Sequence, residues 1–170
     1  MNKKFEQIPL TMIDRVRRNH ALEHATLNIL AQQGIPALSG YSDTVGFWVV
    51  GEVPTEKLQE AINQAVTRLR AGEHDLAIHP YCGTNFLASG AAAGGAAWLA
   101  LVGANNWRRK FDRLPWAIAL ATVALIVSQP LGPFLQKNVT TLAEIGELKC
   151  AEITFYPEAA LPLHRVKTKG

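Results

Sequence analysis

The chain has 170 residues, of which 48% are hydrophobic, and its formal net charge of +3 accompanies a sequence isoelectric point near 9.0. This length suits one ordinary domain, or a small domain joined to a membrane segment. The basic residues form no Lys/Arg stripe, so we expect no nucleic-acid partner, and the two cysteines, Cys82 and Cys150, are too few for a disulfide scaffold.

The first predicted element is a helix that Thr11 can cap, with Asp14 three residues later as the acid of a capping-box pattern. Gly34 and Pro36 mark its end. No apolar run precedes the first arginines, at positions 15, 17 and 18, so we expect no cleaved signal peptide. The apolar stripe of this helix consists of Ile13, Val16, Leu27, Leu30 and Ala31.

Three polar residues, His20, Glu23 and His24, occupy the middle of this stripe. Because residues i, i+3 and i+4 share one face of a helix, these side chains converge on one spot. They need partners there, since an unpaired buried polar group costs about 1–3 kcal/mol. Two imidazoles four residues apart can bind one zinc ion, and the glutamate can take a proton from water at the metal. The alternative is a polar cluster satisfied by hydrogen bonds.

The segment HALEH, residues 20–24, is similar to the His-x-x-Glu-His motif of the inverzincin metallopeptidases. This resemblance implies that His20 and His24 are zinc ligands and that Glu23 is the general base. The third ligand of that family is a glutamate farther along the chain. No clear counterpart of it is found among Glu73, Glu144 and Glu147.

After the first helix the sequence predicts a strand pair and a second helix. In residues 37–53 apolar and polar residues alternate, and β-branched and aromatic side chains are frequent around a Ser-Asp turn. This pattern is typical of a β-hairpin. Thr55 can cap the second helix, which ends at Gly72. Its predicted apolar stripe consists of Leu58, Ile62, Ala65 and Leu69.

Two further strands are predicted outside the apolar part of the chain. Residues 75–80 form a short strand that Pro80 stops, and residues 146–157 form a last strand, followed by a polar tail after Pro162. We expect His74 and His164 to be solvated, because both lie in polar surroundings.

A third metal ligand is expected at residues 79–82. His79 ends a predicted strand and Cys82 follows three residues later, and a His-x-x-Cys pair can bind one metal ion. With His20, His24 and His79 as ligands and an open fourth position, a zinc site would be catalytic, whereas Cys82 as the fourth ligand would make it structural. The simpler interpretation makes His79 a hydrogen-bonded strand-end histidine and Cys82 a small buried hydrophobe.

Three functions remain open at this point. We favour a zinc-dependent hydrolase, most simply a peptidase with a membrane-proximal substrate, in which Glu23 is the general base and Asn85 stabilises an oxyanion. The second is a membrane scaffold with a structural metal. The third makes Cys82 a nucleophile at a helix amino end, with a nearby histidine as base and Asn85 as its orienter.

Two apolar stretches, residues 86–104 and 114–136, contain no charged residue. Each has about the 20 residues that a helix needs to cross a hydrocarbon core. Pro130 and Pro133 should bend or end the second stretch. We therefore expect a transmembrane hairpin with the lipid bilayer as partner, and the alternative is a pair of buried helices in a water-soluble core.

The hairpin carries signals for association and orientation. Gly90 and Gly94 form a GxxxG pair that permits close helix contact, so we expect a homo-oligomer through this face. The basic loop at residues 105–113 would lie in the cytoplasm by the positive-inside rule. The soluble part, however, would then have to be translocated without a signal sequence. We favour a multi-pass cell-membrane protein with a cytoplasmic soluble part.

We therefore predict an α+β fold in which a small soluble domain, with two helices and a short sheet, is interrupted by a transmembrane hairpin. The soluble part covers residues 1–82 and the hairpin residues 83–136, while residues 137–170 supply a strand and a tail that pack on the soluble part. The order of NHALEHAT, HPYCGTN and an apolar hairpin resembles a family of small uncharacterised bacterial membrane proteins, a resemblance that implies no activity.

Overall fold

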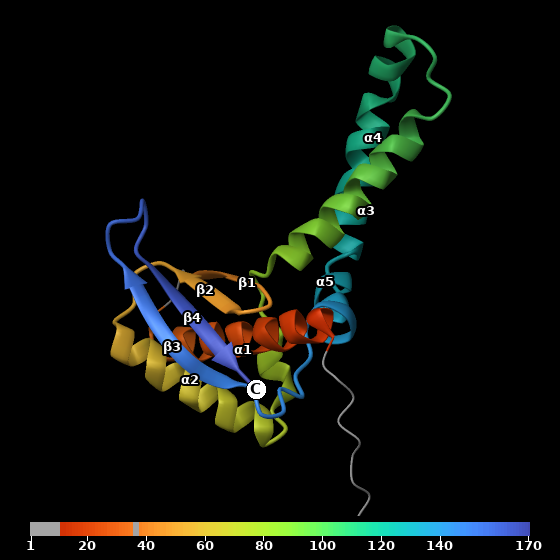
Figure 1. Ribbon diagram of the computed structural model, residues 1–170. Helices are drawn as coiled ribbons and strands as arrows, with labels where there is room; N and C mark the ends of the chain where they lie inside the picture. The colour runs from red at the N-terminus through yellow and green to blue at the C-terminus, as the bar shows by residue number, and fades with distance from the viewer. Residues whose placement is uncertain (1–10, 36–37) are drawn as a thin grey trace, which may run out of the picture. The chain divides into compact units, whose positions relative to one another are not determined.

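The computed structural model describes residues 11–35 and 38–170, and the chain divides into two compact units. One unit comprises the chain up to His79 together with Thr141–Gly170, and the other comprises Pro80–Thr140. Figure 1 labels the helices and strands of both. The prediction for the N-terminal segment and the role of Pro36 concern residues outside the described ranges.

The first unit is an α+β structure in which two helices pack against a four-stranded antiparallel sheet (Figure 1). This confirms the predicted α+β class and the predicted strand pair. The strand order is β1-β2-β4-β3, so the last strand of the chain lies inside the sheet. The elements are α1 (Met12–Gln32), β1 (Ser39–Ser42), β2 (Gly46–Val50), α2 (Thr55–Arg70), the 3-10 helix η1 (His74–Ala77), β3 (Lys149–Tyr156) and β4 (Leu163–Lys169).

The core lies between the helices and one face of the sheet. Phe47 and Val49 of β2 are fully buried, while Trp48 between them lies on the other face, where the Arg165 guanidinium is 4.9 Å from its ring centroid. The predicted stripe of α2 is confirmed, because each of its members is buried. Apolar residues at every second position of β2 and at helical spacing in α2 therefore pack together in one core.

The ends of α1 follow the sequence signals, but its apolar stripe is shorter than predicted. Thr11 caps the helix by accepting a hydrogen bond from the Asp14 amide at 3.1 Å. Gly34, with φ at +81°, follows its end in the left-handed region that glycine favours. Leu27 and Leu30 are buried, whereas Ile13 is 71% exposed and Ala31 is also exposed. The buried residues of the helix lie between Asn19 and Leu30, so Ile13 and Ala31 fall outside its buried part.

The prediction of a strand at residues 75–80 is wrong, because His74–Ala77 form the 3-10 helix η1. The amide of Leu76 donates to the Glu73 carbonyl at 3.2 Å and that of Ile78 donates to the Asp75 carbonyl at 3.1 Å, so both amides bond locally rather than to a neighbouring strand. Leu76 and Ala77 are both buried, although a strand would send them to opposite faces.

The prediction of a polar tail after Pro162 is also wrong, since these residues form β4, which lies between β2 and β3 in the sheet. His164 is fully buried there rather than solvated, and its Nε2 lies 3.0 Å from the Thr55 hydroxyl. Thr55 is the first residue of α2, after Pro54, and its hydroxyl contacts His164 instead of capping the helix. His74 is exposed, as expected, and lies 3.7 Å from a carboxylate oxygen of Glu144.

The second unit is helical. It contains α3 (Gly83–Leu101), α4 (Trp107–Val127), α5 (Leu131–Leu135) and the π-helical turn η2 (Gln136–Thr140). Helices α3 and α4 pack side by side as a hairpin (Figure 1). Helix α4 ends at Val127, shortly before Pro130, and the following segment turns away by 52°, which confirms the predicted bend.

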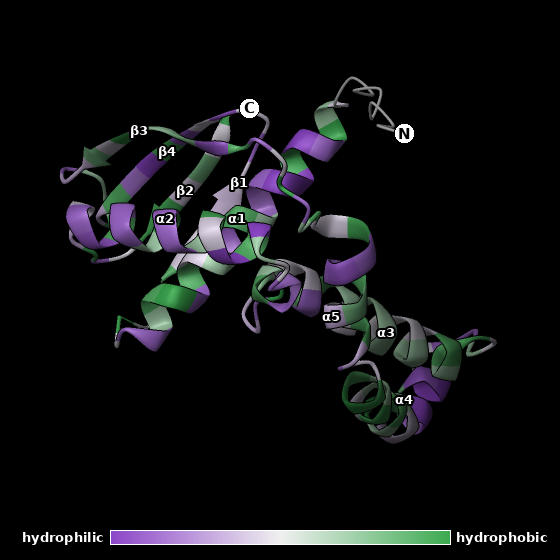
Figure 2. Cartoon of the chain, turned by 90° about the horizontal axis from the view of Figure 1, so that it is seen from below, coloured by the Kyte–Doolittle hydropathy of each residue, from purple (hydrophilic) through white to green (hydrophobic). Residues whose placement is uncertain are grey.

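Hydrophobic residues predominate along much of the hairpin (Figure 2), and many of their side chains are exposed. No residue of α3 is buried, and in α4 Ala117 alone is. The interpretation of these segments as buried core helices is therefore wrong. In the described part of the chain no single helix meets the length and hydropathy that a membrane crossing requires, although α4 and Leu131–Thr140 meet them together as a bent pair.

Candidate metal and acid-base site

Helix α1 brings two imidazole rings together on its buried face. His20 and His24 are one helical turn apart, and their ring centroids are separated by 4.1 Å. One ligand nitrogen of each lies within 4.8 Å of the other, so both can reach one metal ion. His24 is 1% exposed, whereas His20 is half-buried at the edge of the cluster.

His79 joins these two rings from the segment that follows η1. Its ring centroid lies 5.6 Å from that of His24, and the residue is 8% exposed. Leu76 and Ala77 anchor the segment in the core, which holds His79 against α1. His79 is thus a neighbour of His24 within the first unit, although a 3-10 helix rather than a strand precedes it.

Hydrogen bonds determine which nitrogen of two rings carries the proton. Nδ1 of His24 lies 2.7 Å from the Ala77 carbonyl oxygen, and Nδ1 of His79 lies 2.8 Å from Oδ1 of Asn28. Both oxygens can only accept, so each Nδ1 donates and each neutral ring has its lone pair on Nε2. Ligand histidines in metal sites are held in the same way, by a second hydrogen bond that fixes the tautomer.

His79 is neutral at physiological pH. Burial, together with the smaller effect of the nearby His24, lowers the pKa of His79 from 6.5 to about 4. A neutral imidazole is the form that binds a metal, so His79 can act as a ligand without first losing a proton.

Glu23 lies on the same face of α1 and is only 3% exposed. Burial raises its pKa from 4.5 to about 7, against the opposing effects of a hydrogen bond from Ser42 and the charge of His20. The Ser42 hydroxyl donates to Oε2 at 2.5 Å. Strand β1 passes so close that a Cβ at Gly40 would lie 2.4 Å from Oε1. The carboxylate is therefore confined, and its pKa suits proton transfer near neutral pH.

The remaining predicted residues, Cys82 and Asn85, belong to the second unit. Cys82 precedes α3 and is 7% exposed, and its thiol lies 3.4 Å from the Thr84 hydroxyl. His20, His24 and Cys82 carry the kinds of ligand atom that could hold a metal ion. Asn85 donates to the Pro80 carbonyl at 2.7 Å and accepts from the Gln136 amide at 2.6 Å, so its side chain stabilises the start of α3.

The downstream glutamates have other roles. Glu73 forms an ion pair with Arg68 at 2.6 Å, which lowers the pKa of the Glu73 carboxyl. Glu144 lies beside His74 on the surface, and Glu147 is exposed. Three further residues hold the site and were not predicted, namely Asn28, Ser42 and Gly40. The signal for Asn28 was present, because it follows His24 by one helical turn on the same face.

Comparisons with known proteins give a family but no activity. A model of the family described as "Domain of unknown function (DUF6391)" matches residues 15–153, a range that includes the whole histidine cluster. An uncharacterised protein of Picosynechococcus sp. is 36% identical over 140 residues, which cover 74% of this chain. The match spans 65% of that relative, less than two thirds of its length. No solved structure matches the chain.

Proposed function

The chain belongs to the family described as a domain of unknown function (DUF6391), and we propose that it is a zinc-dependent hydrolase attached to a lipid bilayer, with peptides as its substrates. His20, His24 and His79 would bind the metal, and Glu23 would act as general base. Every one of these residues lies in the range that the family model matches.

The observation that carries the proposal is the set of hydrogen bonds that hold two of the three imidazoles. His24 and His79 each donate Nδ1–H to a fixed oxygen, and their rings are 5.6 Å apart. The ring of His20 lies 4.1 Å from that of His24 and would supply the third ligand nitrogen. Three protein ligands with an open fourth position are typical of catalytic zinc sites, and imidazole nitrogen suits zinc.

Glu23 supports a catalytic rather than a purely structural site. A buried carboxyl with a pKa of about 7 can accept a proton at neutral pH, and the Ser42 hydroxyl holds it in place. Bound zinc would supply Lewis acidity and lower the pKa of water beside it. Glu23 would then take the proton from that water during attack on a substrate carbonyl.

We expect purified wild-type protein to bind about one zinc ion per chain. His24→Ala should abolish this binding, because it removes a ligand whose orientation the Ala77 carbonyl fixes. His74→Ala is the matched control, since His74 is exposed and contacts Glu144 instead of the cluster. Metal content by elemental analysis, with zinc titrated in, measures both. Equal zinc retention in the two variants would overturn the metal site.

A second candidate function is a non-catalytic scaffold with a structural metal, and the His-x-x-Cys spacing of residues 79–82 favours it. Cobalt substitution separates the two functions, because a thiolate ligand gives a sulfur-to-cobalt charge-transfer band that three imidazoles and water do not. In the hydrolase, Cys82→Ser should leave the cobalt spectrum and the metal content unchanged. A sulfur band that Cys82→Ser removes would establish the structural site instead.

The second unit supports attachment to a bilayer. Residues 83–106 and 114–136 contain no Asp, Glu, Lys or Arg. Large apolar side chains on both helices are exposed, among them Trp98 at 67% and Trp116 at 70%. Apolar surface on this scale marks an interaction site, and lipid is the partner that fits two apolar segments whose only intervening charges lie at residues 108–113. A Cβ at Gly90 or Gly94 would have nothing within 4 Å, so the face expected for oligomer contact is open.

We expect the full chain to remain with the membrane fraction through extraction at the high pH of sodium carbonate, and to need detergent for release. The reason is the exposed apolar surface of the hairpin, because contact between apolar side chains and water is unfavourable. Immunoblots of pellet and supernatant measure the partition, with a known peripheral membrane protein as the control that the treatment releases. Recovery of the chain as a monodisperse monomer without detergent would contradict bilayer attachment.

A further inference from the structure

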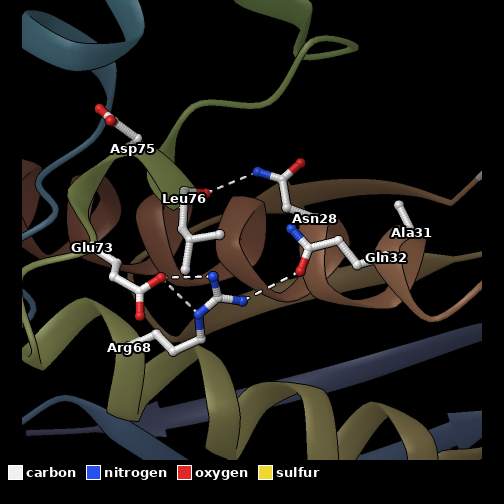
Figure 3. Close-up of a pocket in the computed structure, with 7 residues that line it drawn as sticks. All are labelled: Asn28, Ala31, Gln32, Arg68, Glu73, Asp75 and Leu76. Carbon is white, nitrogen blue, oxygen red and sulfur yellow. Dashed lines mark hydrogen bonds and ion pairs between the residues drawn. The ribbon is translucent and has the colours of Figure 1, made fainter.

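Asn28 connects the histidine cluster to a surface cavity. It lies on α1 one turn beyond His24 and is half-buried. The cavity, of about 640 Å³, is lined by Asn28, Ala31, Gln32, Arg68, Glu73, Asp75 and Leu76 (Figure 3). Asn28 thus belongs both to the lining of this cavity and to the hydrogen bonds around His79.

Two backbone carbonyls fix the orientation of this amide. Nδ2 of Asn28 donates to the carbonyl oxygens of Leu76 and Ile78, each at 2.9 Å. Figure 3 shows the amide nitrogen directed at Leu76 with the oxygen on the opposite side. A flipped amide would place its oxygen against two carbonyl oxygens, so the observed orientation is the stable one. Both N–H groups are used, and Oδ1 is left to face His79.

The next residue in the same segment is held by α1 as well. The carbonyl of Ala77, between Leu76 and Ile78, accepts from Nδ1 of His24. Three successive carbonyls at the end of η1 are therefore bound by side chains of one helix face. This arrangement keeps the segment that carries His79 at a defined distance and rotation from α1.

We infer that Asn28 is a positioning residue for the metal site, which holds His79 in the Nδ1–H tautomer and directs its Nε2 toward the metal. The inference rests on the proposed metal site. Oδ1 of Asn28 accepts from Nδ1 of His79 at 2.8 Å, and an amide oxygen cannot donate in return. Removal of such a partner lowers metal affinity by about 10–100-fold in other metal sites.

The test compares Asn28→Ala with Gln32→Ala in the full chain purified in detergent. Gln32 lies one turn farther along α1, lines the same cavity and accepts from Arg68 at 3.3 Å, so it is the matched control. Zinc affinity is measured by competition with a chelator. The His79 tautomer is measured in metal-free protein from the ring ¹⁵N chemical shifts of histidine-labelled samples, with His79→Ala for assignment.

We expect Asn28→Ala to weaken zinc binding by about 10–100-fold and to convert His79 from one tautomer to a mixture, while Gln32→Ala changes neither. Because Asn28 borders an open cavity, water can fill the vacated space and the fold should survive. Asn28→Ser, too short to reach His79, serves as a second variant if the alanine does not fold, and should behave alike.

The outcomes separate this inference from the function it rests on. If wild type binds no zinc, the proposed metal site fails, whereas the tautomer comparison still tests the role of Asn28. If wild type binds zinc and Asn28→Ala keeps both the affinity and the single tautomer, Asn28 is not a positioning residue. An equal loss of affinity in Gln32→Ala would also overturn the inference, because it would show a general effect of this helix face.

Discussion

Glu23→Gln should lower hydrolysis by about 10²–10⁴-fold and leave the bound zinc unchanged, because a glutamine keeps the shape of the side chain but cannot accept the proton. Glu23 is buried beside His20 and hydrogen-bonded by Ser42, and a glutamine oxygen can still accept from that hydroxyl. Cleavage of a peptide library by the zinc-loaded protein, together with its metal content, measures the two properties separately.

Glu56→Gln is the control for this experiment, since Glu56 is exposed at the start of α2, outside the histidine cluster. It should have wild-type cleavage and wild-type zinc. Hydrolysis that persists in Glu23→Gln would remove Glu23 from the chemistry. A loss of zinc in Glu23→Gln would make the carboxylate part of the metal shell and would favour the structural alternative.

Gly40→Ala should lower hydrolysis by about 10²-fold while zinc binding is kept. A Cβ at this position would lie 2.4 Å from Oε1 and 2.6 Å from Cδ of Glu23, so the carboxylate must move aside. A displacement of about 1 Å in a reacting group costs about this factor in rate. The side chain that must move is flexible, so the free energy of unfolding should fall by only about 1–3 kcal/mol. Cleavage rates and thermal unfolding measure the two effects.

Gly95→Ala provides the comparison for Gly40→Ala, because an added Cβ on α3 would have nothing within 4 Å. It should be active and as stable as wild type. If Gly40→Ala cleaves peptides at the wild-type rate while it is folded, the position of Glu23 under β1 does not matter for the reaction.

Much of the site was visible in the sequence because it lies on one helix. The spacing of His20, Glu23 and His24 sets their common face whatever surrounds the helix, and the cap at Thr11 and the glycine at position 34 fix where that helix runs. The pair β1 and β2 was equally visible, because its turn and its alternation are local. The stripe of α2 was predicted for the same reason.

The features that could not be predicted from the sequence depend on contacts between segments that are far apart in the chain. The 3-10 helix η1 forms because Leu76 and Ala77 both find the core, which no pattern within four residues reveals. Asn28 and Ser42 looked like ordinary polar residues, since their partners, His79 and Glu23, lie on other elements. His164 looked solvated because the polar residues around it conceal a strand whose alternate positions are buried.

The position of β4 between β2 and β3 has a consequence for how the protein is made. β2 emerges from the ribosome before residues 80–140, whereas its partner β4 emerges after them, so Phe47 cannot meet Val166 until the hairpin has been synthesised. Closing such a long loop slows folding. During translation, therefore, one edge of β2 has no partner until β4 has been synthesised. An unpaired strand edge of this kind can pair wrongly with another chain.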